Sequence, residues 1–219
     1  HGLALSAGTV FTGLHRGSAE IDAAWQSVSE VAELVHALGG EHVITIPELW
    51  QRGELGAVEG SREFSAEEWG NFARGRRLLD SFGLRQQFHS HAESPVGSYR
   101  EVVRLLENTD ARYTNLCLDT GHLAYYFGDN VRLIEEHPDR ISYLHLKQVE
   151  PDLLAHVLKN DISFVDAVAQ GVMVEPPLGV PAYAPILEAA RRHNPGIFAI
   201  IEQDMYPVGD FTAPVQIAR

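Results

Sequence analysis

Four short apolar stretches in the second half of the chain each end in a side chain that can bind a metal ion. They are residues 87–91, 116–119, 143–147 and 200–204. Each has the length and apolar character of a buried β-strand, and helical patterns separate them. Parallel strands that alternate with helices bring their C-terminal ends to one face, where α/β enzymes place their chemistry. The pattern predicts an α/β fold with a functional site on that face.

The same alternation runs through the whole chain. Capping boxes at Ser65 and Ser98 mark two helix starts, and Asp129 caps another helix. We expect the remaining connection, residues 149–180, to be a long excursion with short helices at 153–158 and 164–169. The expected strands cover residues 3–6, 42–47, 84–91, 115–119, 141–147 and 197–202, and the longer helices cover residues 18–38, 65–82, 98–106, 129–137 and 184–193.

Two architectures fit six strands that alternate with helices: an open doubly wound sheet and a barrel that lacks two units. Residues 7–10 carry no Gly-rich phosphate fingerprint, and ligands that converge from four consecutive strands favour a barrel. A complete barrel has about 250 residues, whereas this chain has 219 and begins with His1. We therefore expect one domain, residues 1–219, with strands three to eight of a (β/α)8 TIM barrel. The first two βα units would be missing.

The charge and the cysteine content exclude some partners and favour one compartment. A formal charge of −13 opposes binding to nucleic acid, which requires clustered Lys and Arg. No apolar run approaches the roughly 18 residues of a membrane span, and no secretory signal opens the chain. The single cysteine, Cys117, cannot form an internal disulfide, which favours the reducing cytoplasm. We expect a cytoplasmic protein without a nucleic-acid or membrane partner; a homo-oligomer is possible.

Four strand-end side chains are predicted to bind one divalent cation: His89, Asp119, His145 and Glu202. Two imidazoles and two carboxylates give a mixed nitrogen and oxygen ligand set. Gly121 is expected to allow a sharp turn with positive φ that returns His122 toward the same site. The alternative for Asp119 is an Asx-type turn that starts a loop.

Further residues are expected to line the same pocket. Lys147 lies on the strand face of His145, and His91 lies on that of His89, because side chains alternate with a period of two. Glu93 follows closely in the chain. Glu48 and Trp50 follow the second expected strand, and together with Glu93 they are predicted to contact a substrate.

Five segments resemble the xylose isomerase-like sugar phosphate isomerase/epimerase superfamily, and in particular its inosose (2-keto-myo-inositol) dehydratase-like branch. They are HSHAES (89–94), LDTGH (118–122), RISYLHLK (140–147), GVMV (171–174) and IEQD (201–204). The resemblance implies a (β/α)8 barrel with one divalent metal, commonly Mn²⁺, Co²⁺ or Mg²⁺, with Zn²⁺ also possible. It also implies carbohydrate metabolism, such as inositol catabolism.

The resemblance also assigns positions. Asp119, His145 and Glu202 match the metal ligands of barrel strands six, seven and eight, and Lys147 and His122 match pocket residues. Three differences from relatives concern Gln148, which replaces an aspartate, Glu93-Ser94, which replaces Gly-Thr, and Gly97. His89 stands where many relatives carry a strand-five glutamate ligand.

The activity that the resemblance implies is proton abstraction next to the carbonyl of a keto-sugar or keto-cyclitol, with a metal-stabilised enediolate. Glu202 or His89 would take the proton. One of His91, His122 and Lys147 would protonate the departing hydroxyl in a dehydratase (a lyase), or return the proton in an isomerase. Because His89 replaces a glutamate, two-base epimerisation is less favoured than elimination.

Three alternatives remain. The chain could be a sugar (phosphate) isomerase/epimerase that acts on a ketose. It could cleave phosphodiesters, as the related abasic-site endonucleases do, although the negative charge opposes DNA binding. It could also be a non-catalytic metal- or sugar-binding protein, or an inactive fragment with exposed sheet edges.

Overall fold

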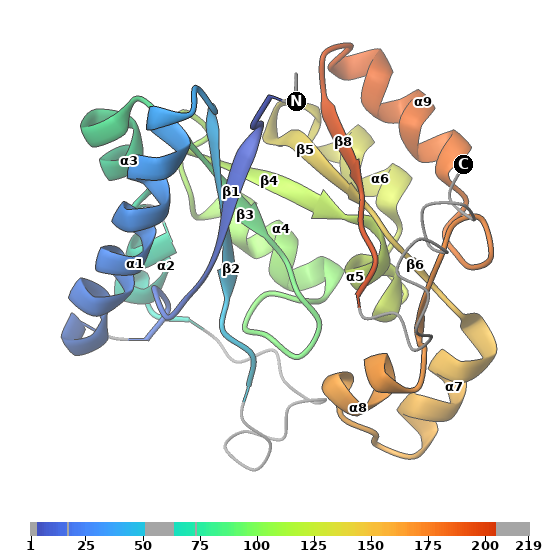
Figure 1. The fold of residues 1–219 in the computed structure, drawn as a ribbon. Coiled ribbons are helices and arrows are strands. Elements are labelled where there is room, and N and C mark those ends of the chain that lie inside the picture. Colours follow the sequence, from blue (N-terminus) through green and yellow to red (C-terminus); the bar gives the residue numbers. More distant parts are fainter. Residues whose placement is uncertain (1–3, 17, 51–63, 73, 205–219) are drawn as a thin grey trace.

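A computed structural model describes residues 4–16, 18–50, 64–72 and 74–204. Its main sheet contains six strands that pair in parallel and in chain order, and Figure 1 shows this sheet at the centre of the molecule. The strands are β1 (Ala7–Thr12), β2 (His42–Pro47), β3 (Arg85–His89), β4 (Thr114–Asp119), β5 (Ile141–Leu146) and β8 (Phe198–Ile201). A small antiparallel pair, β6 (Gln148–Val149) and β7 (Met173–Val174), lies apart from it.

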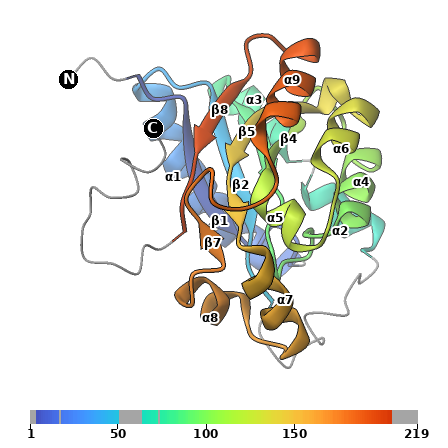
Figure 2. The same cartoon turned by 90° about the vertical axis from the view of Figure 1, so that its right-hand side faces the viewer.

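Helices surround the sheet and also lie beyond the ends of its strands. In Figure 1, α1 to α3 lie on one side and α6 and α9 on the other, and Figure 2 shows α7 and α8 below the sheet. The helices are α1 (Ser18–Ala37), α2 (Ala66–Phe72), α3 (Gly75–Phe82), α4 (Tyr99–Glu107), α5 (Thr120–Tyr125), α6 (Asn130–Glu136), α7 (Pro151–Lys159), α8 (Phe164–Ala169) and α9 (Tyr183–His193), with a 3-10 turn at Pro138–Arg140.

The predicted helix boundaries rest on capping chemistry that is present in the structure. The N–H of Ser65 donates to Glu68, the N–H of Glu68 donates back to the Ser65 hydroxyl, and Ser98 starts α4 with the same box. Asp129 caps α6 by accepting from the N–H of Arg132. The capping predictions are therefore confirmed. Each cap satisfies backbone N–H groups that the first helical turn leaves unpaired.

Three expectations about elements are wrong. The first strand is Ala7–Thr12, not 3–6, because Gly8 lets β1 pack closely against Val31 and Val35 of α1. The single helix expected over 65–82 is two helices, α2 and α3. The six-residue helix α5 follows Asp119 directly and was not predicted.

The apolar core lies mainly between the sheet and its helices. Buried leucines of β4 and β5, including Leu116, Leu118 and Leu144, pack with residues of α4, α6 and α9. A smaller cluster that includes Ile44, Cys117 and Tyr143 fills part of the opposite face. The buried polar residues His89, Asp119 and His145 lie at or near the C-terminal ends of their strands.

Strands β1 and β8 are the two edges of the six-stranded sheet. All four residues of β8 are exposed, including the apolar Phe198, Ile200 and Ile201. Among the described residues, none of the helices combines the length and the apolar character that a membrane crossing requires.

Candidate metal centre and active site

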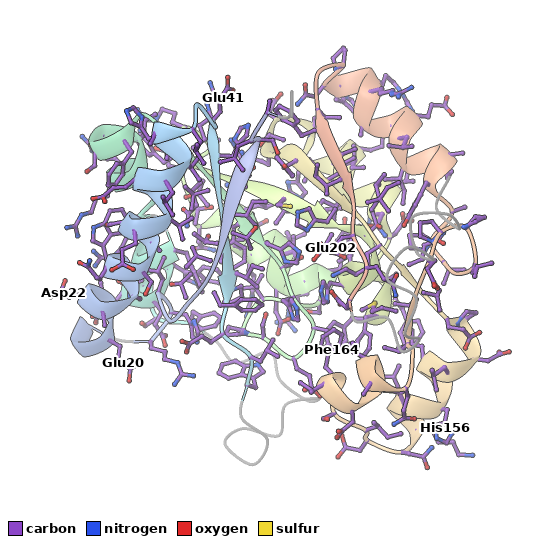
Figure 3. All side chains as sticks on the ribbon, in the orientation of Figure 1. Glu20, Asp22, Glu41, His156, Phe164 and Glu202 are labelled. Atoms are coloured by element: carbon purple, nitrogen blue, oxygen red, sulfur yellow. The ribbon has the colours of Figure 1, made fainter. Side chains whose placement is uncertain are left out.

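Four side chains from four neighbouring strands meet at the C-terminal end of the sheet. His89 ends β3, Asp119 ends β4, His145 lies near the end of β5, and Glu202 directly follows β8. One ligand atom from each lies within 4.8 Å of the others. In Figure 3, Glu202 lies near the middle of the molecule, whereas Glu41, which precedes β2, lies at the opposite end of the sheet. The predicted convergence is present.

Asp119 uses its two carboxylate oxygens for different purposes. Oδ1 accepts hydrogen bonds from the N–H groups of Gly121 (2.9 Å) and His122 (2.8 Å) and so caps α5. Oδ2 lies 3.3 Å from His89 Nε2 and 3.9 Å from His145 Nδ1. The two interpretations of Asp119, a capped turn and a metal ligand, are therefore compatible, because one oxygen satisfies each.

The facing atoms of this cluster have the character of an open coordination site. Within the described part of the chain, the buried atoms His89 Nδ1, His89 Nε2, Asp119 Oδ2, His145 Nδ1 and Glu202 Oε2 lack a well-aligned hydrogen bond. Most of their close contacts are with one another: His145 Nδ1 lies against Glu202 Oε2, and Asp119 Oδ2 lies 3.3 Å from His89 Nε2. Buried charged groups that crowd together in this way are paired with an opposite charge or coordinate a metal ion. Two imidazoles and two carboxylates are suitable ligands for a divalent ion of intermediate softness. The residues present fit a divalent cation.

Lys147 is buried beside the cluster, just after β5. Its Nζ lies 3.3 Å from Asp119 Oδ2, 3.4 Å from Glu202 Oε1 and 2.9 Å from Asp204 Oδ1. Burial alone would lower the pKa of Lys147, but these three carboxylates raise it above its ordinary value. The side chain is therefore an ammonium ion among carboxylates.

The carboxylates of the cluster are ionised for the same reason. Burial would raise the pKa of Asp119, but the Lys147 ammonium holds it well below its ordinary value. Burial likewise opposes ionisation of Glu202, but the contacts with His145 and Lys147 lower its pKa to about 2. Both carboxylates are ionised at neutral pH.

Two further histidines form a buried layer next to His89. The rings of His91 and His122 have their centroids 3.8 Å apart, and the N–H of Ala92 donates to His122 Nδ1. Burial, then the neighbouring His89, lowers the pKa of His91 to about 3. Burial also holds the pKa of His122 well below its ordinary value. Both rings are neutral at physiological pH.

This layer makes the stability of the metal-free protein depend on pH. An unfolded histidine takes up a proton near pH 6.5, whereas folded His91 does so only near pH 3. Stability that is complete above pH 6.5 is therefore lost as the pH falls toward 3, by up to about 1.4 kcal/mol per pH unit for each such histidine. We expect urea unfolding in a chelator to show a lower free energy of unfolding at pH 5 than at pH 7.

Substitution can show which histidine makes the free energy of unfolding depend on pH. His91→Asn should reduce the difference between pH 5 and pH 7, whereas His36→Asn, on an exposed position of α1, should leave it unchanged. An equal free energy of unfolding at the two pH values in the unsubstituted protein would contradict the expectation.

Gly121 is required for a reason other than the one expected. It lies in α5, and positive φ is not among its features, so the expected left-handed turn is wrong. A Cβ at this position would lie 2.8 Å from Lys147 Cγ and 2.9 Å from Lys147 Cβ. The glycine allows α5 to pack directly on Lys147. His122 is still brought beside the site, with its Nε2 3.2 Å from Lys147 Nζ.

The three residues predicted to contact substrate do not lie together. Glu93 is buried with φ of +51°, its N–H donates to the Tyr126 hydroxyl, and its carbonyl accepts from the N–H of Trp50. The Glu48 carboxylate instead pairs with Arg16 at 2.7 Å, in a hollow lined also by residues of α1. Glu93 and Trp50 are thus joined, and Glu48 faces the α1 side.

Two residues beside the site were not predicted to belong to it. Phe164 of α8 packs edge-on against His91, with ring centroids 5.1 Å apart, and lies tilted against His122 at 5.2 Å. Figure 3 labels it on the α8 side of the molecule. Asp204 hydrogen-bonds to Lys147. For Phe164, the only signal in the sequence was the long loop after β5. For Asp204, the only signal was an acidic residue two positions after Glu202.

A curved parallel sheet that carries this ligand set at its C-terminal end defines the class of α/β barrel proteins with a candidate metal site. A family model described as "Xylose isomerase-like TIM barrel" matches residues 1–217, so the chain belongs to that family. The TIM-barrel fold predicted from the sequence is confirmed.

Comparison with individual proteins agrees with this assignment. An inosose dehydratase of Bacillus velezensis is 30% identical over 148 residues, which are 66% of this chain and 50% of that protein. The probable 3-DHS dehydratase AsbF of Bacillus anthracis superposes with a TM-score of 0.70 at 16% identity, over 98% of this chain and 74% of AsbF. The IolI protein, described with a bound zinc atom, gives 0.71 at 13% identity, over 98% and 73%. The chain spans about half the length of the inosose dehydratase that it matches.

Proposed function

We propose that this chain carries the metal centre of an enzyme that removes a proton next to the carbonyl group of a keto-sugar or keto-cyclitol. The observation that carries the proposal is the convergence of buried ligand atoms of His89, Asp119, His145 and Glu202 within 4.8 Å of one another. The similarity to an inosose dehydratase and the zinc atom of IolI support it.

His89, Asp119, His145 and Glu202 would hold the cation. When bound, a divalent cation supplies Lewis acidity, which stabilises the negative charge that develops on the substrate oxygen. Glu202 is the best candidate for the base. Its side chain is 34% exposed, which makes it the most accessible of the four candidate ligands to a substrate. Its lowered pKa keeps the carboxylate ionised, so it carries no proton before the reaction.

Lys147 would serve the departing hydroxyl. It is the cationic donor of the site, because the lowered pKa values of His91 and His122 leave both rings neutral. His122 Nε2, 3.2 Å from Lys147 Nζ, helps to fix the direction of the ammonium group. Glu93 and Trp50 are proposed to contact the remainder of the substrate, with a weaker case for Glu48 because it pairs with Arg16.

Elimination of water is the reaction that we propose first. Epimerisation by two bases requires a second base on the opposite face of the substrate carbon. The position at the end of β3, where many relatives carry a glutamate, holds His89 in this chain, and His89 is buried against Asp119. A dehydratase needs one base and one proton donor, which Glu202 and Lys147 provide. Isomerisation of a ketose uses the same first step and is the alternative that an assay must separate.

Metal removal and replacement test the proposal. The full-length protein is stripped with a chelator, and Mn²⁺, Co²⁺, Mg²⁺ or Zn²⁺ is returned separately with inosose-type substrates and with ketoses. We expect turnover only with metal, and loss of water from the inosose-type substrate. An isomerised ketose without loss of water would favour the alternative. No metal-dependent turnover on either substrate class would contradict the proposal.

A further inference from the structure

Asp204 lies outside the four-residue cluster but contacts its neighbour Lys147. Its Oδ1 accepts a hydrogen bond from Lys147 Nζ at 2.9 Å, which is the shortest of the three carboxylate contacts of that ammonium. The other two carboxylates belong to Asp119 and Glu202, which are both candidate metal ligands. Asp204 is therefore the only one of the three that can hold Lys147 without occupying a ligand of the metal.

Lys147 and a divalent cation would compete for the same oxygens. Nζ lies 3.3 Å from Asp119 Oδ2, and this oxygen is also 3.3 Å from His89 Nε2 within the cluster. A buried positive charge at this distance neutralises the ligand charge and repels an incoming cation, and water cannot screen the repulsion well. The position of the ammonium group therefore affects how strongly the cluster binds metal.

The segment that carries Asp204 is held by hydrogen bonds that do not use the side chains of the candidate metal ligands. The side-chain amide of Gln203 donates to the carbonyl of Met173 in β7 at 2.9 Å. Glu202 is held on the other side, where its N–H donates to the carbonyl of Leu146 at 3.2 Å. The Asp204 carboxylate is thus placed beside Lys147 by its neighbours in the chain.

We propose that Asp204 is a positioning residue that sets the affinity of the metal centre, because it holds the Lys147 ammonium and so leaves Asp119 and Glu202 available to a divalent cation. The inference rests on the proposed function only in its need for a metal. Partners that orient metal ligands typically change metal affinity by about 10- to 100-fold when they are substituted.

A double-mutant cycle with titration calorimetry of Co²⁺ and Mn²⁺ tests this inference on the full chain. Asp204→Asn should weaken binding by about tenfold or more. In a Lys147→Met background, the same Asp204→Asn substitution should change the affinity by less than about threefold, since the ammonium that it positions is gone. A structural role of Asp204 that is independent of Lys147 would give the same loss in both backgrounds, and that result would overturn the inference.

Controls keep the test decisive if Lys147→Met does not fold. Asp204→Glu keeps the charge and should retain most of the affinity, whereas an equal loss in Asp204→Glu and Asp204→Asn would overturn the inference. Asp166→Asn removes a carboxylate that hydrogen-bonds to Ser163, and it should leave binding unchanged. If the unsubstituted chain binds no metal, the proposed function fails and the inference fails with it. If it binds metal but Asp204→Asn binds equally well, only the inference fails.

Discussion

Asp119→Asn is expected to reduce metal-dependent turnover by on the order of a thousandfold, because a Lewis acid contributes several kcal/mol and each 1.4 kcal/mol is about a factor of ten. Asparagine can still cap α5 through its oxygen, so the start of the helix is preserved. Its amide nitrogen, however, replaces the oxygen that lies 3.3 Å from both His89 and Lys147. A candidate metal ligand and a negative charge are lost together.

The measurements are calorimetric metal affinity and turnover with added metal, accompanied by thermal unfolding. Asp129→Asn is the matched control, since Asp129 also caps a helix but lies at an exposed position of α6. It should leave turnover and metal affinity unchanged. Wild-type metal affinity in Asp119→Asn would show that Asp119 is not a ligand.

Gly121→Ala is expected to destabilise the protein by about 1–3 kcal/mol and to lower turnover by about a hundredfold. The added Cβ would lie 2.8 to 3.1 Å from Cγ, Cβ and the backbone carbon of Lys147. These atoms lie near the main chain, so they cannot move aside as the end of a flexible side chain can. Either α5 or Lys147 must shift, and a displacement of about 1 Å in a catalytic group is costly.

Gly70→Ala provides the matched control for this substitution. Gly70 lies within α2, and a Cβ there would meet no described atom within 4 Å. Alanine should therefore stabilise that helix by about 0.5–1 kcal/mol without an effect on turnover. Chemical unfolding and turnover are measured for both variants. Unchanged turnover in Gly121→Ala would show that the contact with Lys147 does not hold the lysine in place.

The sequence predicted elements with strong local signals. The second strand, His42–Pro47, is a β-branched run and was predicted with its observed bounds. The short helix α8 also has its predicted bounds, and in the structure Ser163 caps it. The first strand failed because Ala7–Thr12 is weakly apolar, and its position depends on packing against α1 instead. The short α5 failed because its cap, Asp119, was interpreted mainly as a metal ligand.

The candidate site was predictable to the extent that strand ends determine it. Parallel strands place His89, Asp119, His145 and Glu202 at the same end of the sheet. The strand period of two was the basis for adding His91 and Lys147, but both residues follow the ends of β3 and β5, so the period alone does not place them. Contacts made by loops were not predictable in this way. Phe164 reaches His91 and His122 only because α8 folds back toward the ends of the strands, and no spacing in the chain indicates that return.

The division of labour within the Asp119 carboxylate has a consequence for the choice of residue. Because Oδ1 is anchored by two main-chain amides, the direction of Oδ2 is set before any ion arrives, and binding requires little rearrangement of this ligand. A glutamate has one more methylene group and could not keep both amides and the same ligand direction. We therefore expect position 119 to tolerate fewer substitutions than a requirement for negative charge alone would allow.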